Sequence, residues 1–372
     1  MRIVKVEVVE LRKELGATMA ISRGGFSQRA HALVRLTAED GSTGLGEAVG
    51  NAGHARALLE GGLGRAALGL DPCAIETVRA RLLESAVYYE RKGSAVAAAS
   101  ALEMACWDLF GQARGVPVHA LLGGRCRDSV EAYASDVYWQ EDAGAMAGVA
   151  AGIRDRGYRA LKVHIGRGTP REDAERLRAV RRAIGPGLDL MVDLNAGYDL
   201  LAAREAVRRW AEFDLLWIEE PLHPEHLDAM AALRAHSPVP LAAGENEFRL
   251  HGFKALLEAR AVDVAMPDIG RCGGLWEARA VCFLADAWGI PVSPHNFSSG
   301  VLLAATLHLM AAAPGTRLLE MDTSGNAVYE ELLREPLAFA DGRLAVPGLP
   351  GLGVHLPPET LERHGVSVTV IE

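Results

Sequence analysis

Cysteine is scarce in this chain, which has five cysteines among 372 residues. They stand far apart and include no CxxC pair: Cys73, Cys106, Cys126, Cys272 and Cys282. Isolated cysteines of this kind are typical of reduced thiols rather than of a disulfide framework. The cysteine pattern therefore predicts a cytoplasmic protein.

Long apolar runs and an excess of positive charge are also missing. The longest apolar stretch, residues 300–313, contains His308 and is too short to span a bilayer. The amino-terminal segment is charged from its second residue and lacks the apolar core of a signal peptide. A formal net charge of −9 argues against nucleic acid as the main partner. We therefore expect neither a membrane nor a nucleic acid as a partner.

Polar residues recur along the chain at intervals of 23 to 31 residues, each at or just beyond the end of a short apolar run. They are Lys162, Asp193, Glu219, Glu245, Asp268, His295 and Glu320. The stretches between the runs have the pattern of helices. A strand and a helix about every 25 residues are the period of a β/α barrel, whose strand ends meet at one mouth. The repeat predicts an α/β fold with these side chains gathered at that mouth.

The chain is long enough for a second domain beside the barrel. Residues 1–125 start with strand-like segments and continue as helices, which predicts a small α+β capping domain. The repeat places the barrel in residues 126–321. Residues 322–372 are rich in proline and glycine and lack another strand–helix unit. We expect them to return to the first domain, which leaves the barrel one helix short.

Local signals predict several elements in more detail. Two amino-terminal strands are expected to be joined by a loop over Ala17–Arg29. An alanine-rich helix is predicted from Ser94 to Ala113, because its apolar residues recur at helical spacing. Thr169 and Glu172 form a capping box, with proline at the first helical position between them. This box predicts the start of a barrel helix.

Three carboxylates end three consecutive predicted strands, at Asp193, Glu219 and Glu245. A single acid at such a place is as readily a solvated loop residue or a helix cap. Three at equivalent strand ends, with basic residues on either side, instead indicate ligands of a divalent cation. Carboxylate oxygens suit a hard ion, so we expect one Mg²⁺ per subunit, with Mn²⁺ as a possible substitute.

The whole chain resembles the enolase superfamily, in the mandelate racemase and muconate lactonizing enzyme family and its mandelate racemase subgroup. The motifs that carry the resemblance are GEAVG at 46–50, residues 101–124, Lys162-Val163-His164, VDLNAGY at 192–198, WIEEP at 217–221, GEN at 244–246, PDIGRCGG at 267–274, SPHNF at 293–297 and Glu320. Each motif is weak alone, whereas all of them in this order form a strong signal. The resemblance implies a (β/α)7β barrel with a capping domain of two-part sequence, a homo-oligomer, and abstraction of a proton α to a carboxylate.

The resemblance also assigns roles to the catalytic candidates. Asp268 and His295 match the family's dyad, in which the carboxylate orients the imidazole that acts as base or acid. Lys162 and His164 are two residues apart on one strand, so both can line the mouth. The family often has a second lysine at the place of His164, and histidine is a plausible base near neutral pH. The separate roles of these two residues stay open.

Three further residues are candidates for contact with the substrate. Glu320 matches the acid that hydrogen-bonds the enediolate, a role that requires its protonated form. Asn195 follows a ligand by two residues and is expected to contact substrate. The metal, its three carboxylates, Asp268 and Lys162 together carry one net negative charge. A diacid substrate would therefore need another cation from the capping loop, for which Arg23 and Arg29 are the candidates.

The leading interpretation is a Mg²⁺-dependent dehydratase that converts an aldonate or aldarate, a small carboxylate, into a 2-keto-3-deoxy acid. The alternative is a racemase or epimerase of a 2-hydroxy acid that uses His164 and His295 as opposed bases. Cycloisomerisation of the muconate type fits less well, because Asp268 stands where a lysine is expected. A catalytically silent binding protein would have lost a ligand or dyad residue, and none is missing. The glycines between Gly44 and Gly50 do not match a dinucleotide fingerprint, so no nucleotide cofactor is expected.

Overall fold

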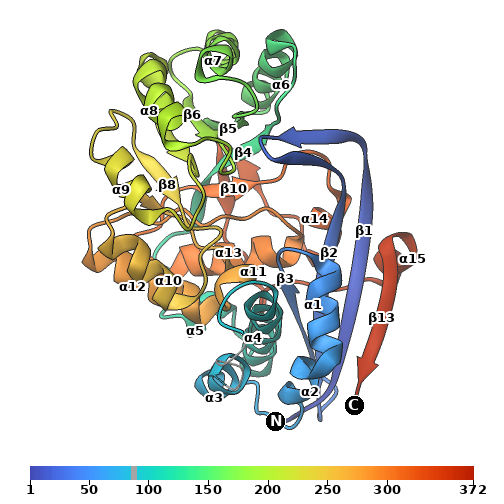
Figure 1. The fold of residues 1–372 in the computed structure, drawn as a ribbon. Helices are drawn as coiled ribbons and strands as arrows, with labels where there is room; N and C mark the ends of the chain where they lie inside the picture. Colours follow the sequence, from blue (N-terminus) through green and yellow to red (C-terminus); the bar gives the residue numbers. More distant parts are fainter. Residues whose placement is uncertain (85–89) are drawn as a thin grey trace.

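The computed structural model describes residues 1–84 and 90–372 and has two parts, each built on its own sheet (Figure 1). Residues 85–89, within the stretch predicted as helical, lie outside the described residues. The first part is an antiparallel sheet in the order β13 (Gly365–Ile371), β1 (Ile3–Ile21), β2 (Gly24–Ala38) and β3 (Thr43–Ala48). Because β13 pairs with β1, the carboxyl-terminal strand completes an amino-terminal sheet.

The structure corrects the predicted loop over Ala17–Arg29. Strands β1 and β2 continue through this range as a hairpin, with Ile21 opposite Gly24. The tip of the hairpin rests on the barrel, where the Ser22 hydroxyl donates a hydrogen bond of 2.6 Å to the Leu194 carbonyl. The hairpin is therefore held by residues distant in sequence, which local turn signals cannot reveal.

Helices cover the antiparallel sheet. They are α1 (Ala52–Leu58), η1 (Leu59–Leu63), α2 (Gly64–Ala67), α3 (Ile75–Arg79), η2 (Ala80–Glu84), α4 (Ser94–Arg114) and α5 (Val118–Leu121). The predicted alanine-rich helix is confirmed as α4, which ends at Gly115 in the left-handed conformation that favours glycine. Gly46 of β3 brings α4 close, since a Cβ atom there would lie 1.9 Å from the Ala101 carbonyl oxygen. The glycines of β3 thus serve helix packing.

The second part is a β/α unit with a parallel sheet, consistent with the (β/α)7β barrel that the family resemblance implies, although seven strands and a bridged segment at Val292 stand in place of eight strands. Its strands are β4 (Ser129–Val137), β5 (Ala160–His164), β6 (Asp189–Asp193), β7 (Leu215–Glu219), β8 (Leu241–Ala243), β9 (Val264–Ala265) and β10 (Leu319–Met321). Parallel pairing runs from β4 to β9, and single bridges continue it from Ala265 to Val292 and on to Thr316. Strand β10 pairs with β4, so the run returns to its start.

Barrel helices alternate with these strands. They are α6 (Ala143–Asp155), α7 (Pro170–Ile184), α8 (Leu200–Arg209) with η3 (Trp210–Phe213), α9 (Leu227–Arg234), α10 (Arg249–Glu258), α11 (Ile269–Cys272), α12 (Leu275–Ala287) and α13 (Gly300–Ala312). The predicted capping box is confirmed, because Thr169 and Glu172 exchange side-chain and backbone hydrogen bonds at the start of α7. Large buried side chains such as Tyr133, Met191 and Trp217 fill the barrel interior, so the chemistry is confined to its mouth.

The segment after β10 touches both parts of the molecule. It contains α14 (Ala327–Glu331), β11 (Phe339–Ala340), β12 (Arg343–Ala345) and α15 (Pro358–His364) before β13. Strand β12 pairs antiparallel with β4 of the barrel, whereas β13 joins the capping sheet. The division of the chain at residues 125 and 321 stays a prediction.

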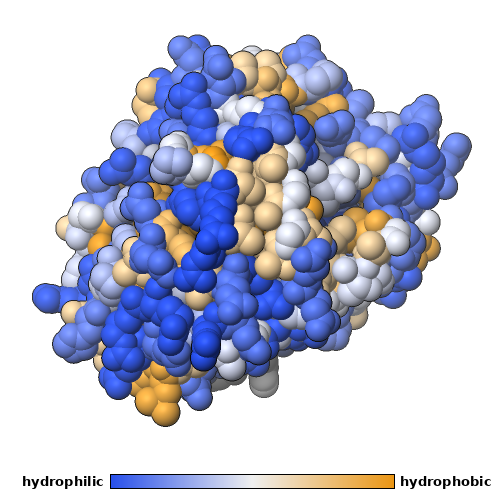
Figure 2. Space-filling model, turned by 90° about the horizontal axis from the view of Figure 1, so that it is seen from above, coloured by the Kyte–Doolittle hydropathy of each residue, from blue (hydrophilic) through white to orange (hydrophobic). Residues whose placement is uncertain are grey.

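The face of the molecule seen from above is mostly hydrophilic, with apolar residues in small patches (Figure 2). Among the described residues, no helix combines the length and the apolar character needed to cross a membrane.

Candidate active site

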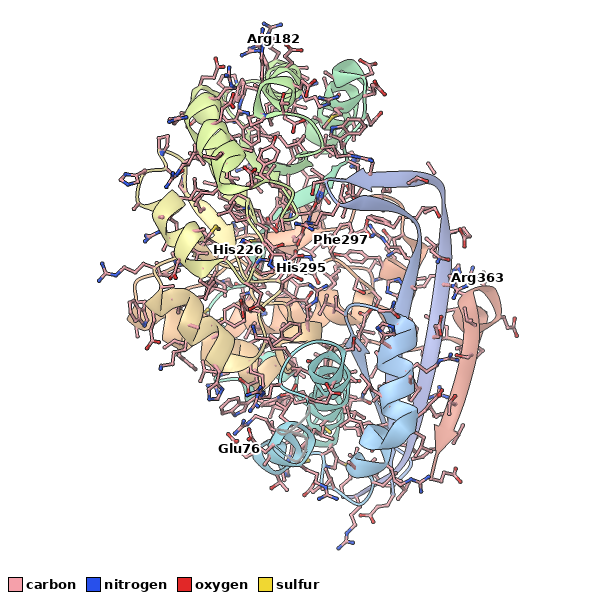
Figure 3. All side chains as sticks on the ribbon, viewed as in Figure 1. Glu76, Arg182, His226, His295, Phe297 and Arg363 are labelled. Carbon is pink, nitrogen blue, oxygen red and sulfur yellow. The ribbon has the colours of Figure 1, made fainter. Side chains whose placement is uncertain are left out.

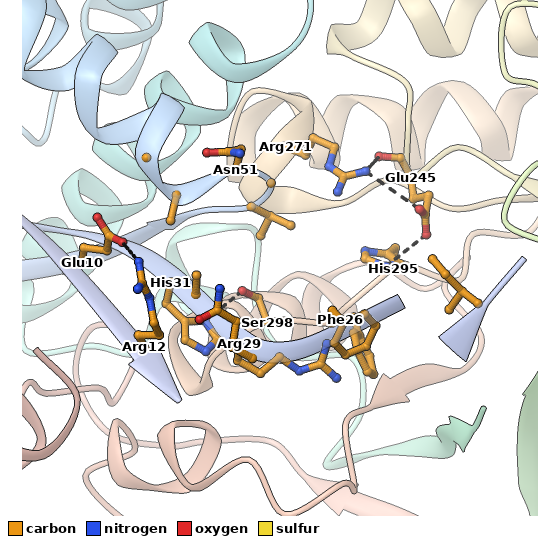
Figure 4. Close-up of a pocket in the computed structure, with 18 of the residues that line it drawn as sticks. Glu10, Arg12, Phe26, Arg29, His31, Asn51, Glu245, Arg271, His295 and Ser298 are labelled. Atoms are coloured by element: carbon orange, nitrogen blue, oxygen red, sulfur yellow. Dashed lines mark hydrogen bonds and ion pairs between the residues drawn. The ribbon is translucent and has the colours of Figure 1, made fainter. Parts of the chain in front are cut away.

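A cavity of about 840 Å³ lies between the barrel mouth and the capping sheet. The barrel lines it with Lys162, His164, Asp193, Asn195, Glu245, Arg271, His295 and Glu320, and the cap lines it with residues that include Arg12, Phe26, Arg29, His31, Asn51 and Arg56. His295 and Phe297 lie near the centre of the molecule, where the two parts meet (Figure 3). The close-up shows His295 beside Glu245 (Figure 4). The cavity thus contains most of the residues predicted from the repeat.

Parallel register brings the predicted side chains together. His164 stands opposite Asp193 across β5 and β6, and Asp193 stands opposite Glu219 across β6 and β7. A bridge pairs Asp268 with His295 in the same way. Because parallel strands end at one edge, these residues converge although they are far apart in sequence.

Lys162 lies at the centre of the acidic residues. Its ammonium nitrogen is 2.9 Å from both carboxylate oxygens of Glu219, 2.8 Å from Glu320 and 3.6 Å from Asp193. Burial opposes the charged form, but Glu219 and Glu320 raise the pKa of Lys162 well above its ordinary value. Lys162 is therefore a fixed cation among three carboxylates.

The three predicted metal ligands have the right chemistry but are paired with other groups. Among the described residues, no three histidine, cysteine or acidic side chains form a ready metal-binding cluster. Glu219 instead bonds Lys162, and Glu245 lies 3.0 Å from Nε2 of His295. Burial, together with Asp193 and other neighbouring acids, raises the pKa of Glu219 to about 8 in spite of Lys162. A set of buried carboxylates with this excess of negative charge fits a hard divalent cation, provided that the side chains turn toward it.

A fourth acid, Glu220, is buried beside this set and was not among the predicted site residues. The Asn246 amide donates to both of its carboxylate oxygens, at 3.0 and 2.9 Å. Burial and the nearby Glu245 raise the pKa of Glu220 well above its ordinary value. The doubled acid in WIEEP was the available signal, but the sequence pattern does not distinguish the two glutamates.

His295 and Asp268 form the predicted contact. Nδ1 of His295 is 2.6 Å from an oxygen of Asp268, which is fully buried. The other ring nitrogen, Nε2, points to Glu245 and lies 3.9 Å from Glu320. Burial alone would lower the pKa of His295, but Glu245, Glu320 and Asp268 raise it to about 10. The dyad thus presents a protonated Nε2 to the cavity.

His164 is held by residues at the ends of strands β4 and β6. Its Nε2 is 3.2 Å from the carbonyl oxygen of Ser135, and its Nδ1 is 3.4 Å from both Asp193 and Asn195. The ring of Tyr138 stacks on the imidazole with a centroid distance of 4.9 Å and an angle of 10°. The sequence repeat did not reveal Ser135 or Tyr138, because neither is a charged residue at the expected spacing.

Asn195 and Glu320 occupy the cavity but differ in how they fit their predicted roles. Asn195 donates from its backbone and amide nitrogens to the two oxygens of Asp193, at 2.8 and 2.9 Å, and so orients that carboxylate. The predicted hydrogen bond from Glu320 requires a protonated acid. Burial favours that form, but Lys162 and His295 outweigh it and hold the pKa of Glu320 far below its ordinary value. The hydrogen bond from Glu320 to the enediolate therefore stays a prediction.

The two capping arginines predicted to bind a second carboxylate each have a partner within the protein, and that role stays a prediction. Arg23 donates to the Ala196 carbonyl at 2.8 Å and is not among the residues that line the cavity. Arg29 lines the cavity, but its guanidinium pairs with the buried Asp322 at 3.2 Å. Arg271 also reaches the cavity, where it donates to the Glu245 carbonyl at 3.0 Å. The structure thus gives the two predicted arginines partners within the protein.

The parallel barrel, the cap over its mouth and the carboxylates around a lysine and a carboxylate-bound histidine define an enolase-type enzyme. Residues 3–123 match the family described as Mandelate racemase / muconate lactonizing enzyme, N-terminal domain, and residues 145–360 match Enolase C-terminal domain-like. The chain belongs to the mandelate racemase and muconate lactonizing enzyme family of the enolase superfamily.

Known proteins of several activities are similar to this chain over nearly its full length. It is 35% identical to the D-galactarolactone cycloisomerase of Agrobacterium fabrum, over 97% of this chain and 98% of that protein. It is 30% identical to the D-xylonate dehydratase of Haloferax volcanii, over 90% of this chain and 85% of that protein. The structure of a racemase from Streptomyces coelicolor A3(2) with bound magnesium superposes with a TM-score of 0.91, at 30% identity over 98% of this chain and 100% of that one.

Proposed function

We propose that this protein abstracts the proton α to the carboxylate of a sugar acid and eliminates the 3-hydroxyl, which yields a 2-keto-3-deoxy acid. One observation carries this proposal: a carboxylate-held imidazole, His295, faces the acidic set of the same cavity that contains His164. Similarity to a D-xylonate dehydratase supports dehydration as the outcome.

Asp193, Glu219 and Glu245 would hold one Mg²⁺ per subunit, with Mn²⁺ as a substitute. When bound, the ion supplies Lewis-acid stabilisation of the enediolate's negative charge. The magnesium bound in the similar racemase supports this choice of metal. The family resemblance further supports a homo-oligomer in the cytoplasm, which sedimentation and cell fractionation would test.

Two histidines at the barrel mouth, His164 and His295, carry out proton transfer. Lys162 is engaged by three carboxylates, so it acts as a cation near the substrate carboxylate rather than as a base. His164 takes the C2 proton, and the electrons of the C–H bond pass into the enediolate. His295 gives its Nε2 proton to the 3-hydroxyl as the C3–O bond breaks, so that water leaves. The enol product then tautomerises to the keto acid.

A second candidate function is the opening of a sugar-acid lactone. The similarity of 35% to a D-galactarolactone cycloisomerase favours it. If the oxygen on the β-carbon belongs to a lactone ring, the same α-proton abstraction opens the ring instead of releasing water. His295 would then protonate the ring oxygen, so both reactions use the same residues.

Proton NMR in D2O with Mg²⁺ and a panel of aldonic, aldaric, lactone and simple 2-hydroxy acids tests the proposal. Loss of the C2 proton with a new C3 methylene signal is expected for a sugar acid, and the same change with ring opening would assign the lactone reaction. Loss of the C2 proton without a methylene would assign racemisation or epimerisation. No reaction with any acid, although Mg²⁺ binds in calorimetry, would contradict the proposal.

A further inference from the structure

We propose that Tyr138 and Arg29 are positioning residues that hold the imidazole of His164, so that the capping domain orients one of the two proton-transfer groups. This inference rests on the proposed function, in which His164 takes the substrate proton. It assigns roles to an aromatic residue that follows β4 and to an arginine of β2.

The ring of Tyr138 restrains His164 in the direction that its hydrogen bonds leave free. Contacts of Nε2 with Ser135 and of Nδ1 with Asn195 limit rotation within the plane of the imidazole. The nearly parallel Tyr138 ring, at 4.9 Å and 10°, limits tilting out of that plane. A proton-transfer group must meet its substrate within a narrow range of angle and distance, so this tilt matters for the rate.

Tyr138 is fixed in turn by two residues of β2. Phe26 meets its ring edge-on, with a centroid distance of 5.6 Å and an angle of 84°. The Arg29 guanidinium donates a hydrogen bond of 3.2 Å to the Tyr138 hydroxyl oxygen. Both contacts reach from the cap into the barrel mouth, so the position of Tyr138 depends on the position of the cap.

Arg29 joins three parts of the mouth at once. Its guanidinium lies between two aromatic rings, 4.3 Å from the centroid of Phe26 and 4.1 Å from that of Phe297. It also pairs with Asp322, which directly follows β10, at 3.2 Å. The close-up shows Arg29 beside Phe26 in the cavity wall (Figure 4). An arginine with these partners orients its neighbours rather than binding a substrate carboxylate.

The arrangement acts on one side of the cavity. His295 takes its orientation from Asp268 at 2.6 Å, and Tyr138 stacks on His164 instead. Loss of the Tyr138 ring should therefore disturb proton transfer through His164 and spare transfer through His295. This difference separates positioning from a general role in folding.

The test is exchange of the C2 proton with D2O, followed by NMR for two sugar acids that are epimers at C2. Each epimer presents its C2 proton to a different histidine, and His295 accepts one only after its own Nε2 proton has passed to the solvent. Tyr138→Leu should slow exchange of one epimer roughly 10- to 100-fold, through kcat rather than KM, and change the other less than about twofold. Tyr138→Phe keeps the stack and should retain most of the rate. The exchange rate of Arg29→Lys should lie between the rates of Tyr138→Leu and Tyr138→Phe.

Tyr158→Leu is the matched control, because Tyr158 is a buried tyrosine that stacks on Phe339 and does not line the cavity. It should slow neither epimer selectively. Equal slowing of both epimers by Tyr138→Leu, or no slowing of either, would overturn the inference.

A second measurement does not depend on activity. In NMR spectra of protein with labelled histidine, the signals missing from His164→Gln identify His164. The stacked Tyr138 ring should shift the resonance frequencies of these signals. Tyr138→Leu should remove that displacement, and Tyr138→Phe should keep it. His164 signals that are unchanged in Tyr138→Leu would overturn the inference even if no substrate were turned over. Wild-type protein that exchanges neither epimer would count against the proposed function instead.

Discussion

Lys162 sets the charge balance of the barrel mouth, because its buried ammonium group contacts Glu219 and Glu320 within 2.9 Å. Charged groups this deep are stable only when their partners are in place. The lysine and the protonated His295 together neutralise part of the acidic set. A divalent cation would compete for the same carboxylates, which links proton and metal binding at this site.

His295→Asn should abolish most of the elimination, because asparagine cannot deliver the proton that the leaving oxygen requires. We expect kcat to fall by about 10²- to 10⁴-fold. Mg²⁺ binding, measured by calorimetry, should persist. His226→Asn is the control, since this exposed histidine, labelled in Figure 3, is not among the residues that line the cavity and should leave the rate unchanged. A His295→Asn variant with near-normal kcat would rule out the assigned role.

A buried histidine outside the site predicts sensitivity to acid. Burial, with a smaller contribution from His119, lowers the pKa of His308 from its ordinary value to about 3. The unfolded chain therefore takes up this proton first, so stability should fall as pH drops from about 6.5 toward 3. The loss from this group is at most about 1.4 kcal/mol per pH unit.

Melting temperatures of wild type and His308→Gln between pH 7 and pH 5 check this expectation. The variant should be less stable at pH 7 but should lose less stability on acidification. Burial raises the pKa of Glu103 to about 7, which acts in the opposite direction, so only the comparison of the two proteins isolates His308. Parallel curves for the two proteins would contradict the prediction.

At the scale of elements, the packing of α4 against β3 joins helix and sheet in the capping domain. Gly44 and Gly46 have no side chains to keep the helix away, and a Cβ at either position would lie within 2.3 Å of a backbone oxygen of α4. The Asp108 carboxylate of α4 accepts a hydrogen bond of 2.9 Å from the Leu45 nitrogen between them. The GLG sequence is therefore a packing motif.

Gly46→Ala should destabilise the protein, because the new methyl group meets backbone atoms that cannot rotate away. We expect a loss of about 1–3 kcal/mol and a lower melting temperature in calorimetry. Gly61→Ala is the matched control, since among the described residues no atom outside its chain neighbours and its own helix backbone lies within 4 Å of its added methyl group. Equal melting temperatures for the two variants would show that α4 can shift to make room.

At the scale of the whole molecule, the cavity exists because two parts of the chain meet. The barrel supplies the acids, Lys162 and both histidines, and the cap closes the space with Phe26, Arg29 and their neighbours. The barrel end of the cavity has the same types of residue that the family resemblance implies. The cap end carries residues that differ in size and charge, so we expect substrates to be distinguished there.

Mg²⁺ should stabilise the whole protein, because an ion that binds only the folded state shifts the unfolding equilibrium. At 100 times its dissociation constant the gain is about 2.7 kcal/mol, and chelation should remove both this gain and the activity. Glu245→Gln should reduce the shift in melting temperature, whereas Glu39→Gln, an exposed residue of the cap, should not. A melting temperature independent of Mg²⁺ would contradict the proposed ligand set.

The sequence by itself determined the features that repeat or that depend on neighbours along the chain. The period of strand and helix predicted the barrel and placed Lys162, Asp193 and His295 at its mouth, because parallel strands of one barrel must end together. The capping box at Thr169 and the helix from Ser94 could likewise be predicted, since both depend on residues within a few helical turns along the chain.

Only the tertiary structure decided which segments distant in sequence come into contact and how each contact changes its residues. The hairpin over Ala17–Arg29 forms because its tip rests on the barrel, and the pKa of Glu320 is lowered because Lys162 reaches it from another strand. Tyr138 and Arg29 acquire their roles only where β2 crosses the barrel mouth. The contacts of Ser22 and Arg29 join segments separated by more than 100 residues, and no local pattern records which side chains will meet.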